Sequence, residues 1–226
     1  IRSIAPTSLY TKEIDSRAKG ALAYALAHSY YLTEDYKAST QYLQNFGVER
    51  SLEGKVLRAR IHWDQGDRAE AFALLNAGLK IAGREEASDI FKLIVDYRTS
   101  QGDWRAATLA AKLWRLRMPG DSLPRIYLFR LLYQQGDTAE ATREAWSLID
   151  QFSQNGDAMQ DLSDQAAELG HAELVGEIHS IAKAAGFDTK IYLLLGIEAH
   201  ITAGAYAEAI KSAERILAEE PGPSGE

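Results

Sequence analysis

A glycine recurs every 34 residues through most of this chain, at Gly102, Gly136, Gly170 and Gly204. Gly66 precedes Gly102 by 36 residues, and a turn-like Glu34 precedes Gly66 by 32. A period of this length is typical of one supersecondary unit copied along a chain, and such units stack so that each contacts only its neighbours. The spacing therefore predicts a solenoid of repeated units and disfavours a globular enzyme domain.

The residues around each glycine predict a helix, a tight turn and a second helix. Glycine ends the first helix because it adopts a left-handed backbone without steric cost. The aspartate that follows can cap the second helix by accepting its free N–H groups, as at Asp67, Asp103 and Asp137. A small residue five positions after the glycine lets the two helices approach closely: Ala71, Ala107, Ala141 and Ala209. Aromatic residues two positions after the turn are expected to fill the gap between neighbouring units: Tyr36, Trp104 and Tyr206.

The pattern predicts six helix pairs. The expected helices span residues 20–33 and 36–47, 52–65 and 68–82, 88–101 and 104–117, 122–135 and 138–152, 156–169 and 172–185, and 190–203 and 206–219. A longer link is expected near Gly83, and prolines at Pro119 and Pro221 should end two second helices. We therefore expect a lead-in at 1–16, a six-unit array at 17–220 and a flexible tail at 221–226.

This combination of glycine, alanine and terminal proline in a 34-residue unit resembles the tetratricopeptide repeat family over about residues 17–221. The resemblance implies an all-α, right-handed superhelix of antiparallel helix pairs. It also implies that the first helix of each pair lines a concave groove that binds a peptide or protein. The match inside the units is looser than the spacing, since Val175 stands where an alanine is expected in the fifth unit.

The resemblance places one stripe of first-helix residues in that groove. The stripe is aromatic and basic over the first four units, and it includes one acidic residue: Tyr24, His28, Tyr31, Arg60, Trp63, Lys92, Asp96, Arg130 and Tyr133. Aromatic and arginine side chains contribute most to binding at protein interfaces. For Tyr24 and Tyr31, packing between successive first helices is the alternative. Some members of the family bind chaperone C-termini through lysines and asparagines at these positions, and this chain has no such set.

Four carboxylates follow on one face of the fifth unit's first helix: Asp157, Asp161, Asp164 and Glu168. Like charges at these helical spacings repel one another unless a cation offsets them. The stripe is either a solvated face or a surface for a basic peptide or a cationic polymer. A calcium site is disfavoured, because hard-cation sites usually draw their oxygens from a turning loop.

The charge is unevenly distributed along the chain. Residues 1–136 hold 20 Lys and Arg against 15 Asp and Glu, whereas residues 137–226 hold 5 against 17. This polarity suggests an electrostatically oriented partner or self-association, and an unevenly charged solvated surface is the alternative. Nucleic-acid binding is disfavoured because it needs a concentrated basic face. No apolar stretch approaches the ~18 to 20 residues that span a bilayer, so we expect no membrane insertion.

The sequence gives no support for catalysis. It has no cysteine, which excludes disulfides and thiolate metal sites and leaves cytosol and periplasm equally open. No zinc-protease motif, phosphate-binding glycine loop or nucleophile elbow is present. His171 and His179 lie about 12 Å apart by helix rise, too far to share a metal ion. We therefore expect no catalytic residue, no metal and no cofactor.

The sequence predicts a non-catalytic scaffold that binds a protein or peptide through its concave groove. One alternative is a docking module of a bacterial envelope machine for polysaccharide export or secretion. Another is a peptide-sensing regulatory domain. Formation of a homo-oligomer is compatible with all three, because the basic and acidic parts of the chain are complementary.

Overall fold

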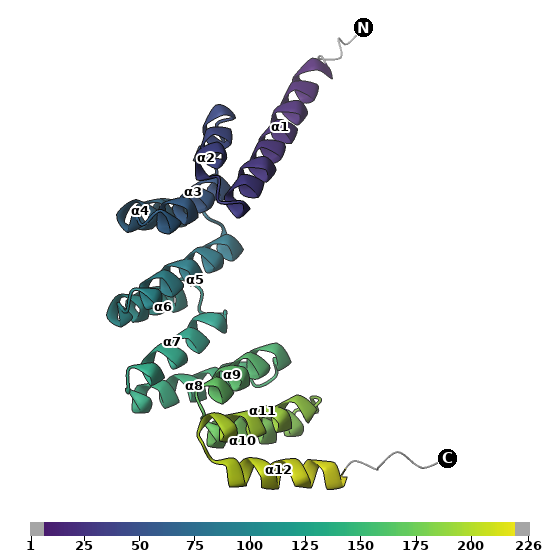
Figure 1. The fold of residues 1–226 in the computed structure, drawn as a ribbon. Coiled ribbons are helices and arrows are strands. Elements are labelled where there is room, and N and C mark those ends of the chain that lie inside the picture. The colour runs from purple at the N-terminus through teal and green to yellow at the C-terminus, as the bar shows by residue number, and fades with distance from the viewer. Residues whose placement is uncertain (1–6, 220–226) are drawn as a thin grey trace. The chain divides into compact units, whose positions relative to one another are not determined.

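The computed structural model describes the backbone of residues 7–219, and over that range the chain contains α-helices, one 3-10 helix and no strand (Figure 1). The α-helices are α1 (Thr7–Leu32), α2 (Tyr36–Asn45), α3 (Leu52–Asp64), α4 (Arg68–Leu79), α5 (Arg84–Ser100), α6 (Trp104–Arg117), α7 (Leu123–Gln134), α8 (Thr138–Phe152), α9 (Gly156–Glu168), α10 (Ala172–Ala184), α11 (Lys190–Thr202) and α12 (Tyr206–Glu219). The predicted all-α class and the helix pairs are confirmed. The tail predicted at 221–226 lies outside the described residues.

The largest differences from the predicted helix boundaries lie at α1, α2, α4 and α5, and α1 includes residues 7–16 of the predicted lead-in. Helix α1 begins at Thr7, well before residue 20, and a short 3-10 helix (Val48–Arg50) follows α2. Helix α5 begins at Arg84, where a longer link was expected. Glu85 and Glu86 occupy its first turn, where negative charge is favoured by the helix dipole. The extra residues of that repeat therefore lengthen a helix.

The chain divides into two units, residues 1–94 (unit 1) and 95–226 (unit 2), with the boundary inside α5. In unit 1, α1 packs on α2 and α3 packs on α4. In unit 2, α7 packs on α8, α9 on α10 and α11 on α12, and the first helices α7, α9 and α11 lie side by side in that order. Each unit is therefore built from the antiparallel pairs that the period predicts.

The predicted turn chemistry is confirmed at the glycines. All five turn glycines have a positive φ, between 73° and 85°. The side chains of Asp67, Asp103 and Asp137 accept hydrogen bonds from backbone N–H groups at the start of the second helix, at 3.1 to 3.3 Å. In the first repeat Asp35 caps α2 in the same way, and Glu34 occupies the glycine position with φ 63°. A non-glycine residue is strained there, because its Cβ crowds the following carbonyl oxygen.

Unit 1 has a core of aliphatic side chains covered by tyrosines. Ala27, Leu43, Leu57 and Ile61 are almost fully buried, and partly buried residues pack around them: Tyr24, Tyr31, Tyr36, Tyr42 and Val48. The Ser39 hydroxyl donates a hydrogen bond to the Ala27 carbonyl at 2.7 Å, which ties α2 to α1. The rings of Tyr30 and Tyr42 stack with centroids 5.3 Å apart, so aromatic contact joins the same two helices.

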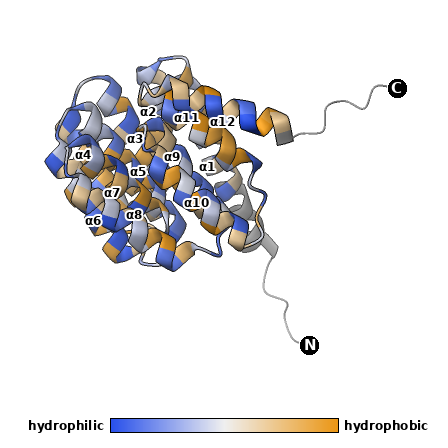
Figure 2. Cartoon of the chain, turned by 90° about the horizontal axis from the view of Figure 1, so that it is seen from below, coloured by the Kyte–Doolittle hydropathy of each residue, from blue (hydrophilic) through white to orange (hydrophobic). Residues whose placement is uncertain are grey.

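Unit 2 has a larger core and a polar network between its repeats. Its fully buried side chains include Trp114, Leu128, Phe129, Leu148 and Leu162. Each helix also carries hydrophilic residues along its length (Figure 2).

The small positions after the turns are buried as predicted: Ala71, Ala107, Ala141 and Ala209, with Val175 in the fifth repeat. The expectation that aromatics fill the gap between repeats is wrong for Tyr206, whose exposed fraction is 63%.

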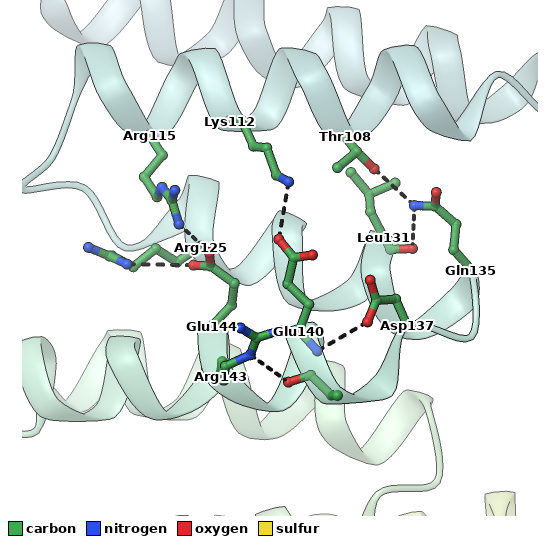
Figure 3. Close-up of polar contacts among 11 residues, drawn as sticks. Thr108, Lys112, Arg115, Arg125, Leu131, Gln135, Asp137, Glu140, Arg143 and Glu144 are labelled. Carbon is green, nitrogen blue, oxygen red and sulfur yellow. Dashed lines mark hydrogen bonds and ion pairs between the residues drawn. The ribbon is translucent and has the colours of Figure 1, made fainter.

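Ion pairs connect α8 to α6 and to α7 (Figure 3). Lys112 Nζ lies 3.1 Å from Glu140 Oε1. Glu144 is 9% exposed and forms ion pairs with two arginines, Arg115 and Arg125, the latter at 3.6 Å. We call these five residues the α6–α8 ion-pair network. A nearly buried carboxylate between two guanidinium groups fixes these helices to one another through charge.

Candidate binding groove

One face of unit 2 is hollowed between the first helices α7, α9 and α11. The hollow has a volume of about 380 Å³, and we call it the α7–α9–α11 groove. Its apolar lining consists of Leu123, Ile126, Tyr127 and Leu195. Its polar lining consists of Arg130, Asp161, Asp164, Gln165, Glu168 and Glu198. First helices of consecutive repeats thus contribute side chains to one concave surface.

The floor of the groove is apolar. Ile126 and Leu195 are 4% and 7% exposed, because each also packs into the core of its repeat. Leu123 remains 37% exposed at the start of α7. A ligand that covered Leu123 would therefore bury apolar surface in addition to any polar contact.

Arg130 is the cationic side chain of this lining, and two neighbours hold it. Its guanidinium group lies 3.7 Å from Asp96 of α5 and 4.6 Å from the centre of the Tyr127 ring. The ion pair offsets part of its charge, and the stacking fixes its plane. Arg130 is therefore already engaged and contributes less free positive charge to the groove than an unpaired arginine would.

The carboxylates of the groove interact with one another. Burial raises the pKa of Asp161, and the neighbouring charge of Asp157 raises it further. Burial also raises the pKa of Asp164, followed by the charges of Asp161, Glu168 and Glu198. Both shifts mean that the ionised forms are disfavoured relative to water. The groove is therefore a region of negative potential that a cation would stabilise.

The groove contains several of the residues predicted from the sequence, but on a shifted stripe. The position six before the turn glycine lines it in three repeats, at Arg130, Asp164 and Glu198. Of the predicted acidic stripe, Asp161, Asp164 and Glu168 line the groove and Asp157 does not.

The position three before the glycine lies elsewhere. Tyr133 packs against His171 of the next repeat, with ring centroids 5.6 Å apart, and Ala167 is fully buried. Instead, the position nine before the glycine lines the groove, at Tyr127, Asp161 and Leu195. Tyr127 and Leu195 were not predicted from the sequence. The signal that could have identified them is the spacing of 3 residues between the nine-before and six-before positions, which places both on one helix face.

The predicted residues of unit 1 form a separate aromatic cluster. Tyr24, His28 and Tyr31 follow one face of α1, with ring centroids 6.1 and 6.2 Å apart. Burial raises the pKa of Tyr31, as does the hydrogen bond that its hydroxyl donates to Asp64, while Arg60 opposes the shift. Both tyrosines also pack on the core of unit 1, so they contribute to contact between α1 and α3.

Two further predicted residues of unit 1 sit apart from this cluster. The Trp63 ring meets Phe72 edge-on at 5.9 Å and lies 5.6 Å from the guanidinium carbon of Arg68. Lys92 is exposed on α5. The indole therefore packs partly within its own repeat, between α3 and α4.

The histidines and acidic residues of the described part of the chain were compared with the requirements of a metal site. No group of three or more histidine and acidic side chains there is placed to hold a metal ion. His179 and His200 line a smaller cavity of about 140 Å³ together with Ser212 and Arg215. Burial lowers the pKa of His179, as do the charges of Lys183 and Arg215. Among the described helices none has the length and apolarity needed to cross a membrane.

Comparison with known proteins identifies similar structures. No family model and no curated protein matches the sequence. The solved structure of Pseudomonas aeruginosa pilF is similar over 91% of this chain and 95% of its own, with a TM-score of 0.52 and 13% identity. A tetratricopeptide repeat protein from Parabacteroides merdae is similar over 90% of this chain and 81% of its own, with a TM-score of 0.54 and 13% identity. At this level of identity the likeness concerns the fold.

Proposed function

We propose that this chain, which has the tetratricopeptide repeat fold of its structural neighbours, is a non-catalytic scaffold that binds a peptide or protein segment. The observation that carries the proposal is the α7–α9–α11 groove. It combines a concave shape, an apolar floor and convergent polar side chains, which are the usual features of a ligand-binding surface. Its walls come from consecutive repeats, so an extended ligand can contact several of them at once.

The chemistry of the groove favours binding over catalysis. Its titratable groups are carboxylates whose pKa values burial and mutual repulsion raise, together with an arginine engaged by Asp96 and Tyr127. The lining residues include neither a histidine nor a serine, so the groove has no serine–histidine pair of the kind that activates a hydroxyl nucleophile. The groove is also open to solvent rather than closed over a reacting centre, as expected for a surface that holds a segment of another chain.

The aromatic cluster of unit 1 supplies a second proposed contact surface. Arg60 lies close enough to Tyr24 and Tyr31 for its charge to lower the pKa of each, against the effect of burial. An arginine beside aromatic rings is a common composition for residues that contribute strongly to binding. We propose that Arg60 and Trp63 add contacts for the same class of ligand.

The proposal is tested by blocking the groove without changing its charge. A random peptide library displayed on phage is selected on the full chain, and the enriched peptides are measured by titration against two variants. Gln165→Trp places a large ring in the groove lining, whereas Gln160→Trp places the same ring on an exposed site of the same helix outside the lining. We expect Gln165→Trp to weaken binding by about tenfold or more and Gln160→Trp to leave it unchanged. Enriched peptides that bind all three proteins equally, or a selection that enriches none, would contradict the proposal.

A further inference from the structure

We infer that the α7–α9–α11 groove selects a basic peptide segment, with lysine or arginine side chains on its carboxylates and aliphatic side chains on its floor. The inference rests on the proposed scaffold function and specifies the chemistry of its ligand. A segment of this kind matches both the charge of the groove and its apolar floor.

The lining of the groove carries more negative than positive charge. Four carboxylates line the groove: Asp161, Asp164, Glu168 and Glu198. Arg130 is the cation among the lining residues, and its charge is shared with Asp96 outside the lining. The local balance is therefore strongly negative, and residues 137–226 as a whole contain 5 Lys and Arg against 17 Asp and Glu. Complementary charge would attract a basic segment and reject an acidic one.

The negative charge of the groove comes from two neighbouring helices, α9 and α11. Asp161, Asp164 and Glu168 lie on α9 at spacings of 3 and 4 residues, and Glu198 reaches the groove from α11. Burial raises the pKa of Asp164, and the charges of the other three carboxylates raise it further. A cation bound between α9 and α11 would offset repulsion that the empty groove retains. The binding energy then comes from several carboxylates that act together, which a single exposed ion pair cannot match.

The apolar floor of the groove favours a peptide with aliphatic side chains over a simple polycation, which has none to place there. Leu123, Ile126 and Leu195 add apolar surface to the lining, and Leu123 adds most of it, being 37% exposed against 4% and 7% for the other two. Lysine and arginine have long aliphatic stems that cover such a surface while their charged ends remain at the rim. The volume of about 380 Å³ falls in the range of small-ligand pockets and suits a few side chains of an extended segment.

The experiment uses three fluorescein-labelled octapeptides with the full chain. One alternates leucine with lysine, one alternates leucine with glutamate, and one alternates serine with lysine. Fluorescence anisotropy at low and at physiological salt gives each affinity. We expect the leucine–lysine peptide to bind about tenfold or more tighter than either of the others, because only it satisfies both the charge and the floor. Its binding should also weaken as salt screens the carboxylates.

Charge-removing variants locate the site. The double variant Asp164→Asn with Glu198→Gln removes two carboxylates from the groove and should weaken the leucine–lysine peptide by about tenfold. The matched control, Glu177→Gln with Glu214→Gln, removes the same charge from exposed positions on α10 and α12 outside the groove lining and should leave the affinity nearly unchanged. Because the groove substitutions relieve repulsion, we expect that variant to fold, and circular dichroism checks this.

The outcomes separate this inference from the scaffold function. If library peptides bind the groove but the leucine–lysine peptide does not, or if the leucine–glutamate peptide binds as well, the inference is overturned and the scaffold function stands. If the serine–lysine peptide binds equally, the surface takes a polycation without using its floor, which also overturns the inference. If neither the library nor any of the three octapeptides binds in the groove, the scaffold function itself fails.

Discussion

The first helices of units 1 and 2 occupy equivalent places in their repeats and present different chemistry. In unit 1 one face of α1 carries a row of partly buried rings, Tyr24, His28 and Tyr31. In unit 2, α9 carries three carboxylates of the α7–α9–α11 groove, and of these Asp164 shares its place in the repeat with His28. The backbone frame is the same, because turn glycines, capping aspartates and small residues recur in both. The frame therefore fixes where a surface is displayed and leaves its chemistry free to differ from repeat to repeat.

The connections between helices differ in the same way. In unit 1, Tyr30 of α1 stacks on Tyr42 of α2 with ring centroids 5.3 Å apart. In unit 2, α8 is joined to α6 and α7 by the α6–α8 ion-pair network. Aromatic stacking responds weakly to salt, whereas partly exposed ion pairs are screened by it. The two units should accordingly differ in how their stability depends on ionic strength.

The largest expected effect comes from core substitutions, which test whether units 1 and 2 unfold independently of one another. Leu57 in unit 1 and Leu128 in unit 2 are 1% and 0% exposed. Either substitution to alanine should lower the free energy of unfolding by about 2 to 5 kcal/mol through lost burial and a residual cavity. Because each repeat contacts only its neighbours, the loss of amide protection should be concentrated in the substituted unit. Hydrogen exchange measured by mass spectrometry checks this, and an equal loss across residues 7–219 would show one cooperative array.

The next effect measures how much the ion pairs of unit 2 contribute to its stability. Glu144→Ala removes the carboxylate between Arg115 and Arg125 and leaves the two guanidinium groups without it. We expect a loss of about 2 kcal/mol, because Glu144 is 9% exposed and each hydrogen-bonded charge pair is worth more where water is excluded. Glu140→Ala is the matched control, since its pair with Lys112 is more exposed and should cost less than about 1 kcal/mol. Urea unfolding at low and high salt measures both, and equal losses for the two variants would contradict the ranking.

A smaller effect concerns the first turn, where the frame of unit 1 departs from its repeat. Glu34 has φ 63° at the position that glycine occupies in every later turn. Glu34→Gly should raise the free energy of unfolding by about 1 kcal/mol by removing left-handed strain. Gly66→Ala should lower it by a similar amount, because an added Cβ meets no atom within 4 Å and the cost comes from the backbone. Thermal unfolding of both variants checks the opposite signs, and a destabilised Glu34→Gly would show that the glutamate side chain has a compensating role.

The smallest effect concerns the charge of the groove. The pKa of Asp164 is raised in the folded state above the ordinary value of 3.8, so the folded protein binds protons more readily than the unfolded chain in that range. Stability from this group is therefore gained as pH falls from neutral towards about 4 and is lost as pH rises. Asp164→Asn should stabilise the protein slightly at pH 7 and reduce that pH dependence. Urea unfolding at pH 7 and 5 measures it, with Glu214→Gln on α12 as the control, and a destabilised Asp164→Asn at pH 7 would contradict the repulsion.

The turns and helices were predictable because their signals are local. A glycine followed by aspartate specifies both a left-handed residue and a helix cap, and Asp67 and Asp103 make the expected bonds. The start of α5 was not predicted, because Gly83 suggested a link, whereas Glu85 and Glu86 extend the helix. A helix terminus depends on which of several weak signals prevails, so its position is less certain than the presence of the helix.

The sequence by itself determined the period, the all-α class and the turn positions, and its resemblance to a known repeat family suggested the six-before position for the groove. The helices and turns follow from backbone preferences within one repeat, and the period follows from the recurrence of the same signals along the chain. The tertiary structure decided which neighbouring position lines the groove as well, the one nine residues before the glycine or the one three residues before it. Tyr127 rather than Tyr133 lines it, since Tyr133 packs on His171. Each residue turns a helix by about 100°, so the rotation of α7 against its neighbours moves the nine-before position into the groove and the three-before position out of it. That rotation is set by packing between repeats, and no single repeat encodes it.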